Sequence, residues 1–178
     1  MSRLPPLPVE ALPVPLQDAL ARGRQNRMLS STLPPRIWAH RPAVATAWLA
    51  ALEEIHVRGC LDERLRELVR LRIAAITTCQ PCMLARKTER VTEEDVACLS
   101  SEDSRFTLAE RSALRFAELF AGDYLSIDDA TYQDLALHFS VEQIVELNLY
   151  CALMLAGGRM TYVQRAYEPA TGPTASEQ

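Results

Sequence analysis

The sequence is poor in glycine, in aromatic residues and in long apolar runs. Only 6 of its 178 residues are glycine, and 6% are aromatic. Few glycines leave few of the tight turns that a hairpin-rich all-β fold needs, and few aromatic rings weaken the case for a protein that stacks nucleic-acid bases. The richest apolar stretch, residues 144–156, contains Glu146 and Asn148, so we predict no membrane span.

The sequence also lacks an excess of positive charge. Its 19 Lys and Arg are outnumbered by 23 Asp and Glu, which gives a net charge of −4 at pH 7 and excludes a generally basic nucleic-acid-binding domain. The N-terminus carries prolines where a secretory signal would need an apolar segment. Because the five cysteines are an odd number, a disulfide framework is not indicated, and we expect a cytoplasmic protein with reduced thiols.

Proline content and helical periodicity divide the chain into three parts. The first 16 residues include five prolines, which fix φ and remove amide donors, so residues 1–32 are predicted to form a proline-rich arm with a short helix. We expect this arm to be either mobile or laid across a neighbouring subunit. Residues 33–167 repeat apolar residues at spacings of three and four and predict one helical domain. Residues 168–178 are predicted to be a disordered tail.

The predicted fold is therefore all-α, with about seven or eight helices. Capping patterns mark several predicted helix starts, namely Thr92 with Asp95, Thr107-Leu-Ala-Glu, Ser126-Ile-Asp-Asp and Ser140-Val-Glu-Gln. Gly157-Gly158 interrupts the last, largely apolar helix. A helix end or kink is the expected explanation of this glycine pair, and close helix packing is the alternative.

Two of the cysteines stand three residues apart, as Cys79-Gln80-Pro81-Cys82. Thr78 is predicted to cap a helix with Pro81 in its first turn, where proline loses no intrahelical bond. Both sulfurs then lie near the helix N-terminus, where amide dipoles favour a thiolate and lower the thiol pKa. A partner at this spacing can close a disulfide once the first sulfur is oxidised, so the pair predicts a redox centre.

Two other interpretations of the cysteine pair stay open, namely inert core thiols and half of a zinc site. A zinc site needs two further ligands at suitable spacing, and the remaining cysteines and histidines are isolated in sequence, at Cys60, Cys98, Cys151, His40, His56 and His138. We therefore predict no metal. No bound cofactor is predicted either, because the sequence has no glycine-rich phosphate loop.

The segment Leu65-Arg-Glu-Leu-Val-Arg-Leu-Arg-Ile-Ala-Ala, followed by Cys79-x-x-Cys82, resembles the carboxymuconolactone decarboxylase-like superfamily. It is most similar to the branch of AhpD-like alkylhydroperoxidases and peroxidase-related proteins. The resemblance covers roughly residues 33–167, including Ala39-His40-Arg-Pro42 and residues 106–117 and 138–147. It implies an AhpD-like helical bundle that assembles as a homo-oligomer (a dimer, trimer or hexamer), with the pocket near subunit contacts.

The same resemblance implies roles for four residues. In that family a glutamate twelve residues before the first cysteine belongs to a proton relay, and this position is Glu67 here. The second cysteine, here Cys82, attacks the peroxide, and the first, here Cys79, resolves the sulfenic acid by forming a disulfide. The relay histidine, four residues after the second cysteine, is Arg86 here. Because a guanidinium stays protonated and has no acceptor, we expect Arg86 to hold a thiolate by charge and to pair with Glu67, but not to shuttle protons.

The relay candidates have plainer interpretations as well. Glu67 could instead be a helix-surface residue that pairs with arginines close in sequence, which are Arg64, Arg66, Arg70 and Arg72. His40 and His56 are candidates for a distant substitute for the missing relay histidine, although each is more commonly an ordinary surface or core-edge residue.

Together these features predict a thiol-dependent, peroxidase-like oxidoreductase of the alkylhydroperoxidase type, impaired by Arg86. Cys82 would attack a small hydroperoxide and become a sulfenic acid, Cys79 would condense with it, and an unknown thiol reductant would restore the dithiol. One alternative is a non-redox lyase or isomerase of the carboxymuconolactone decarboxylase type. Another is a non-catalytic family member. No nucleic-acid or membrane partner is expected.

Overall fold

All regular secondary structure in residues 2–167, the part of the chain that the computed structural model describes, is helical. This confirms the all-α prediction. The α-helices are α1 (Val14–Gln25), α2 (Leu33–Trp38), α3 (Pro42–Arg58), α4 (Glu63–Ile76), α5 (Gln80–Leu84), α6 (Glu93–Ala97), α7 (Leu108–Gly122), α8 (Asp129–Ala136) and α9 (Val141–Gln164), with short 3-10 turns η1 (Val9–Ala11) and η2 (Tyr124–Ser126). None of the described helices is long and apolar enough to cross a membrane.

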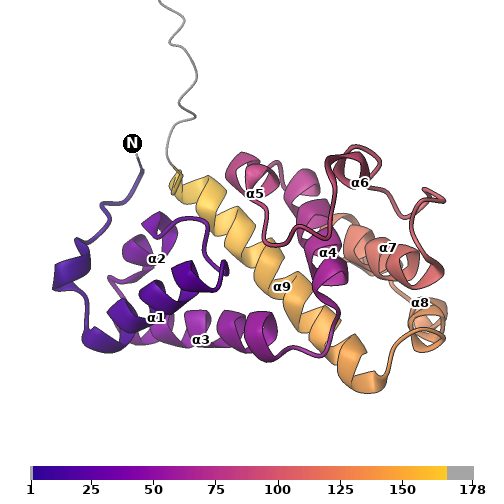
Figure 1. The fold of residues 1–178 in the computed structure, drawn as a ribbon, viewed down its shortest axis with the longest axis horizontal. Helices are drawn as coiled ribbons and strands as arrows, with labels where there is room; N and C mark the ends of the chain where they lie inside the picture. Colours follow the sequence, from indigo (N-terminus) through magenta and orange to yellow (C-terminus); the bar gives the residue numbers. More distant parts are fainter. Residues whose placement is uncertain (1, 168–178) are drawn as a thin grey trace, which may run out of the picture.

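The longest helix, α9, runs between two groups of helices (Figure 1). Helices α1, α2 and α3 lie on one side of it, and α4 to α8 lie on the other. Helix α4 packs against both α7 and α9, and the largest core cluster fills the space between them, around Val69, Phe116 and Leu147. Because α9 has neighbours on both sides, most of its circumference can be apolar, as the sequence indicated.

Side-chain caps explain where many of these helices begin. Thr92, Thr107 and Ser140 each accept a bond from the third residue of the following helix, as their capping patterns predicted. The start predicted at Ser126 is wrong. Helix α8 begins at Asp129, because the Asp128 carboxylate accepts the Thr131 amide and serves as the cap instead.

The glycine pair does not end α9, which continues to Gln164. A Cβ atom added at Gly158 would lie 3.4 Å from the Thr77 hydroxyl oxygen, and one added at Gly157 would lie 3.8 Å from the Trp48 ring. The predicted helix end is therefore wrong. Both distances are ordinary van der Waals contacts, and they place Gly158 beside the end of α4, next to the cysteine pair.

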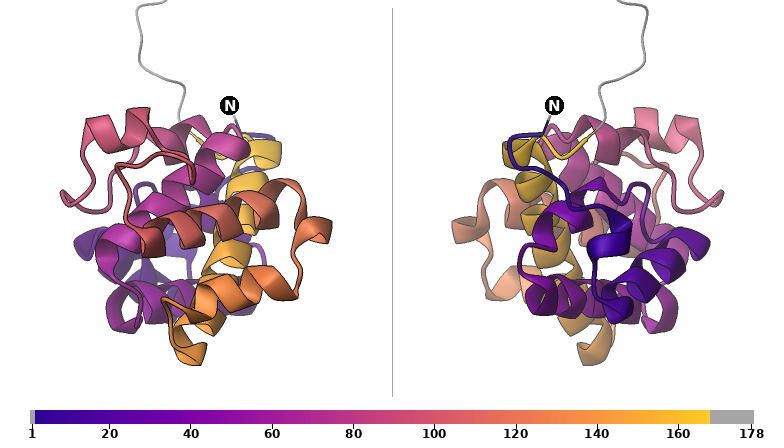
Figure 2. Two further views of the ribbon diagram at one scale, coloured as in Figure 1. Left: turned by 90° about the vertical axis from the view of Figure 1, so that its right-hand side faces the viewer. Right: turned by 90° about the vertical axis from the view of Figure 1, so that its left-hand side faces the viewer.

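The proline-rich N-terminus packs on its own chain, and α1 begins already at Val14. Leu12 and Leu16 are buried in a cluster with Leu49 of α3, and the Leu7 amide donates to the Arg36 carbonyl at 3.1 Å. Figure 2 shows these N-terminal elements covering one face of the bundle. The expectation of a mobile arm, or of one laid across a neighbour, is corrected because the apolar face of α1 is buried against α3. The predicted tail, residues 168–178, lies outside the described residues.

The N-terminal segment should therefore contribute to global stability. Leu16 is fully buried, so Leu16→Ala is expected to lower the free energy of unfolding by about 2–5 kcal/mol. Val14→Ala is the matched control, because Val14 lies on the same helix and is 67% exposed; its effect should stay within about 0.5 kcal/mol. Urea denaturation measures both. Equal effects of the two variants would contradict the packing described here.

Candidate functional site

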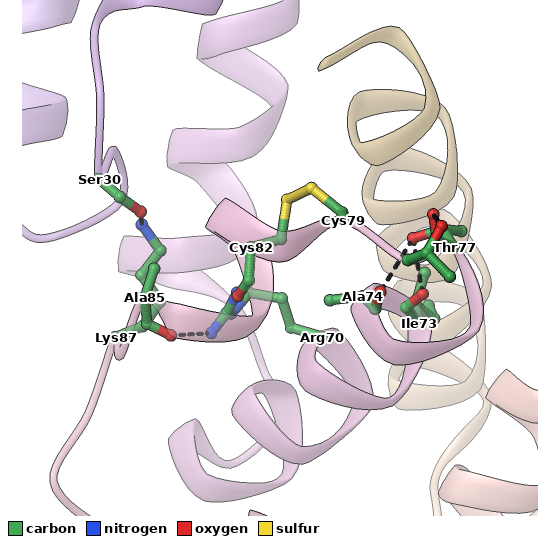
Figure 3. The surroundings of a disulfide bond; sticks show 10 residues. Ser30, Arg70, Ile73, Ala74, Thr77, Cys79, Cys82, Ala85 and Lys87 are labelled. Atoms are coloured by element: carbon green, nitrogen blue, oxygen red, sulfur yellow. Dashed lines mark hydrogen bonds between the residues drawn. A yellow bond between two sulfur atoms is a disulfide. The ribbon is translucent and has the colours of Figure 1, made fainter. Parts of the chain in front are cut away.

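The two cysteines of the Cys79-x-x-Cys82 motif are joined as a disulfide at the start of the short helix α5 (Figure 3). Their Cα atoms lie 5.2 Å apart, within the range that a disulfide bridges without backbone movement. Pro81 occupies the first turn, as predicted. The two sulfurs have different surroundings: Cys79 is 1% exposed, whereas Cys82 is partly exposed and lines a pocket.

Thr78 does not cap α5, and that prediction is wrong. The residue has a φ of 52°, in the left-handed region, and it closes the end of α4. Its amide donates to the Ala75 carbonyl at 3.2 Å, and the Cys79 amide donates to the Ala74 carbonyl at 3.0 Å. These two bonds form a Schellman turn, so the chain reverses between α4 and α5 and Cys79 becomes the residue that precedes α5.

Glu67 lies inside the protein and forms an ion pair with Arg70. Its two carboxylate oxygens accept bonds of 2.7 and 2.8 Å from Arg70 Nε and Nη2, and one of them also accepts the Lys87 amide at 2.9 Å. Pairing with a nearby arginine was the plainer interpretation of Glu67, but the pair is buried and not on the helix surface. Both carboxylate oxygens are engaged by these donors.

Arg70 connects this ion pair to the cysteine segment. Its Nη1 donates to the Cys82 carbonyl at 2.6 Å, and its Nη2 donates to the Ala85 carbonyl at 2.7 Å (Figure 3). A guanidinium can do this because it carries five donors in a fixed planar arrangement. Glu67, Arg70 and the Lys87 amide therefore fix both ends of residues 82–87. Arg70 was considered in the sequence only as a pairing partner, and its link to Cys82 depends on a turn that periodicity does not reveal.

Arg86 does not contact Glu67, which corrects the predicted pairing. Helix α5 ends at Leu84, so the helical register that would place residue 86 next to Cys82 is lost. The Arg86 guanidinium instead pairs with Glu93 at 2.9 Å and donates to the Met83 and Ala85 carbonyls. Its hydrogen bond to Glu93 raises the pKa of Arg86, so it stays a cation.

The two histidines considered as substitutes for the relay histidine form hydrogen bonds with backbone carbonyls away from the cysteine pair. His40 Nε2 lies 2.9 Å from the Pro5 carbonyl oxygen, and His56 Nε2 lies 2.8 Å from that of Asn26. Burial is the main cause of the lowered pKa of His56. Neither histidine lines the pocket at Cys82. Across residues 2–167, no three His, Cys, Asp or Glu side chains gather in a way that could hold a metal ion.

The pocket at Cys82, here called the Cys82 pocket, has a volume of about 470 Å³. Its walls come from α1 and the loop that follows it, from α2 and α3, and from α4, α5 and α9. Trp38 and Trp48 pack edge to face in this wall with ring centres 5.9 Å apart. This volume lies within the range of pockets that hold small organic molecules.

Lys87 also lines the Cys82 pocket and was not predicted as a site residue. Its ammonium donates to the Met28 carbonyl at 2.8 Å and to the Ser30 hydroxyl at 2.7 Å (Figure 3). The pKa of Lys87 is lowered to about 8, mainly by burial and also by the positive charge of Arg70, while Glu67 opposes the shift. In the sequence, Lys87 is visible only as a basic residue just after the predicted cysteine helix, and nothing in the local pattern indicates that its side chain lines the pocket.

The fold and the site together define an all-helical protein with a cysteine pair, one sulfur buried and the other at an organic-sized pocket. The chain matches the carboxymuconolactone decarboxylase family over residues 42–119, and it is 30% identical to the uncharacterized protein YnjA of Escherichia coli K12 over 165 residues, which cover 88% of each chain. It belongs to the carboxymuconolactone decarboxylase family, as the motifs predicted.

Two solved structures show that the fold is AhpD-like. One is an alkylhydroperoxidase AhpD core, an uncharacterized peroxidase-related protein from Ralstonia eutropha, with a TM-score of 0.74 and 20% identity over 95% of this chain and 93% of that one. The other is a cysteine-to-alanine variant of the debrominase Bmp8 in complex with 2,3,4-tribromopyrrole, with a TM-score of 0.79 and 18% identity over 96% and 93%.

Breaking the buried ion pair should destabilise the protein strongly. Glu67→Gln keeps the shape of the side chain but leaves the Arg70 charge buried without its partner, so a loss of about 3–5 kcal/mol is expected. Glu54→Gln, which breaks the exposed pair with Arg58, is the control and should barely change stability. Urea denaturation distinguishes the two, and a similarly small effect at both positions would argue against a structural role for the Glu67 pair.

The lowered pKa of Lys87 predicts how stability depends on pH. An unfolded lysine titrates near about 10.4, whereas Lys87 titrates at about 8 in the fold. Between these values the unfolded chain binds more protons, so this lysine makes the free energy of unfolding rise with pH. Wild type should therefore gain stability relative to Lys87→Gln as the pH rises from about 8 to about 10, with no such trend below about pH 7. A difference independent of pH would show that the Lys87 pKa is normal.

Proposed function

We propose that the protein is a dithiol–disulfide oxidoreductase in which Cys82 is the nucleophile and Cys79 the resolving thiol. The observation that carries this proposal is the asymmetry of the pair: Cys82 lines the pocket, while Cys79 is 1% exposed and bonded to it. A nucleophile must meet its substrate, and a resolving thiol needs to reach only the first sulfur. Membership of the family supports the same assignment of roles.

Hydroperoxides are the leading substrate class. The Cys82 thiol first loses a proton, and its thiolate attacks the terminal oxygen of ROOH. The O–O bond breaks, and the departing alkoxide takes up one proton and leaves as the alcohol. The resulting sulfenic acid condenses with the Cys79 thiol, which forms the disulfide and releases water. An external dithiol then donates two electrons to restore both thiols. Because Arg86 is turned to Glu93 and cannot accept a proton, turnover is slower than in a protein with a relay histidine.

A second candidate uses the same two sulfurs on a halogenated aromatic ring. The aromatic wall of the pocket and the fold shared with the debrominase Bmp8 favour it. Here the Cys82 thiolate takes the halogen from carbon, the carbon gains a proton, and Cys79 displaces halide to leave the disulfide. The sum is one C–X bond and two thiols converted to one C–H bond, a disulfide, halide and a proton.

We also propose that the chain forms a closed homo-oligomer. Val141, Val145 and Leu149 recur every four residues along α9 and are each more than half exposed. An apolar stripe of this kind is covered when a second copy packs on it.

Thiol titration of the reduced protein tests the proposed chemistry. One equivalent of cumene hydroperoxide should remove two thiols per chain and produce the Cys79–Cys82 disulfide, because the oxidant supplies two electron equivalents. Cys82→Ser should not lose its remaining Cys79 thiol quickly. Cys79→Ser should stop at a trapped sulfenic acid at Cys82, which mass spectrometry detects. Cys98→Ser is the control, because Cys98 lies outside the pocket.

Two results would change the assignment. Peroxide consumption by Cys82→Ser at the wild-type rate would overturn the role of Cys82. Release of bromide from a brominated pyrrole by the reduced protein, dependent on Cys82 and without reaction with peroxide, would favour the second candidate over the first.

A further inference from the structure

We propose that the Cys82 pocket selects organic molecules that carry a negative charge on an apolar or aromatic body, with the Lys87 ammonium as the partner of the charge. This inference names the substrate class of the proposed oxidoreductase and rests on that function only for the reaction at Cys82. The binding preference itself does not require redox chemistry.

The first argument is the charge of the pocket wall. Four of its described lining residues are cations, Arg24, Arg36, Arg70 and Lys87, and none is an aspartate or glutamate. The chain as a whole has a net charge of −4. A concave site with positive walls in an acidic protein concentrates the positive potential at that site and attracts anions there.

The second argument separates Lys87 from the other three cations. Arg70 is already neutralised by Glu67 through two hydrogen bonds. Arg24 is exposed, and Arg36 is partly buried and donates through Nε to the Leu7 carbonyl. Lys87 and Arg36 are both partly buried and form no ion pair within residues 2–167, but Lys87 belongs to the cysteine segment that also carries Cys82.

The bonds of Lys87 leave room for a ligand. An ammonium has three donors, and two of them reach the Met28 carbonyl and the Ser30 hydroxyl. The third donor has no partner among the described residues. A partly buried cation without a counter-charge is less stable than one in water, which agrees with its lowered pKa. An anionic group in the pocket would supply both the missing acceptor and the missing charge.

The third argument concerns the body of the ligand. Trp38 and Trp48 line the pocket together with Leu52, Leu153 and Met154. The indole nitrogen of Trp48 is buried and has no hydrogen-bond partner in the described part of the chain. These side chains provide an apolar and aromatic wall beside the cations, and the enclosed Trp48 nitrogen does not add a polar contact to it. A small inorganic anion would leave that wall in contact with water.

Intrinsic fluorescence provides a direct test. The chain has two tryptophans, and both line the pocket, so a ligand there changes their emission. The probes are 4-tert-butylbenzoate and the neutral 4-tert-butylbenzamide, which have the same body and do not react with thiols. Titration of oxidised wild-type protein near pH 7 should give an affinity for the carboxylate about tenfold or more above that for the amide, an ion-pair preference of about 1.4 kcal/mol.

Two variants separate the pocket charge from the overall charge. Lys87→Gln keeps donors for Met28 and Ser30 but removes the charge, and it should reduce the carboxylate preference to about twofold or less. Arg41→Gln removes one exposed positive charge outside the pocket and should leave the preference unchanged. Circular dichroism of each variant verifies the fold. Should Lys87→Gln misfold, Lys87→Arg, which keeps the charge, should retain the preference.

The outcomes distinguish this inference from the proposed function. Equal affinity of wild type for the two probes overturns the inference, even if cumene hydroperoxide is reduced through Cys82. An equal loss of preference in Lys87→Gln and Arg41→Gln also overturns it, because the effect would then come from the net charge. A preference for the carboxylate that is lost only in Lys87→Gln supports it, even if Cys82 proves inert to every oxidant.

Discussion

The buried pair of Glu67 and Arg70 is the interaction on which the site depends. Arg70 alone joins the carboxylate of α4 to two carbonyls of the cysteine segment, those of Cys82 and Ala85, and Glu67 accepts the amide of Lys87. A buried ion pair gains little net stability compared with apolar residues, but its fixed geometry orients the groups bonded to it. The pair therefore sets where residues 82–87 lie, and with them the nucleophile and the cation of the pocket.

The same geometry explains why the two sulfurs differ. The Schellman turn at Thr78 reverses the chain after α4 and brings Cys79 into the interior, and α9 passes this turn at Gly158. One helical turn later, Cys82 lines the pocket. A pair with one protected and one accessible thiol suits a sequence of attack and resolution better than a pair with two equivalent thiols.

The sequence predicted the all-helical class, most helix starts, the cysteine pair and the pairing of Glu67 with a nearby arginine, because these depend on local periodicity, capping and spacing. It did not predict the link from Arg70 to Cys82, the turning of Arg86 to Glu93 or the position of Lys87. Those features depend on α5 ending at Leu84, where guanidinium groups bond the carbonyls that the helix leaves free. They also depend on the N-terminal segment packing on its own chain, which supplies Met28 and Ser30 to Lys87. Both are tertiary effects that no local pattern encodes.

Differential alkylation of the reduced protein tests the central claim, that the Glu67–Arg70 pair places Cys82 at the pocket and so makes it more accessible than the buried Cys79. Wild type treated briefly with iodoacetamide should be labelled at Cys82 at least about tenfold faster than at Cys79, since a thiol must be accessible to react, and peptide mapping by mass spectrometry measures both rates. In Arg70→Met the difference between the two cysteines should largely disappear while the helical content is retained. Equal labelling of the two cysteines in wild type, or an unchanged difference in Arg70→Met, would contradict the account.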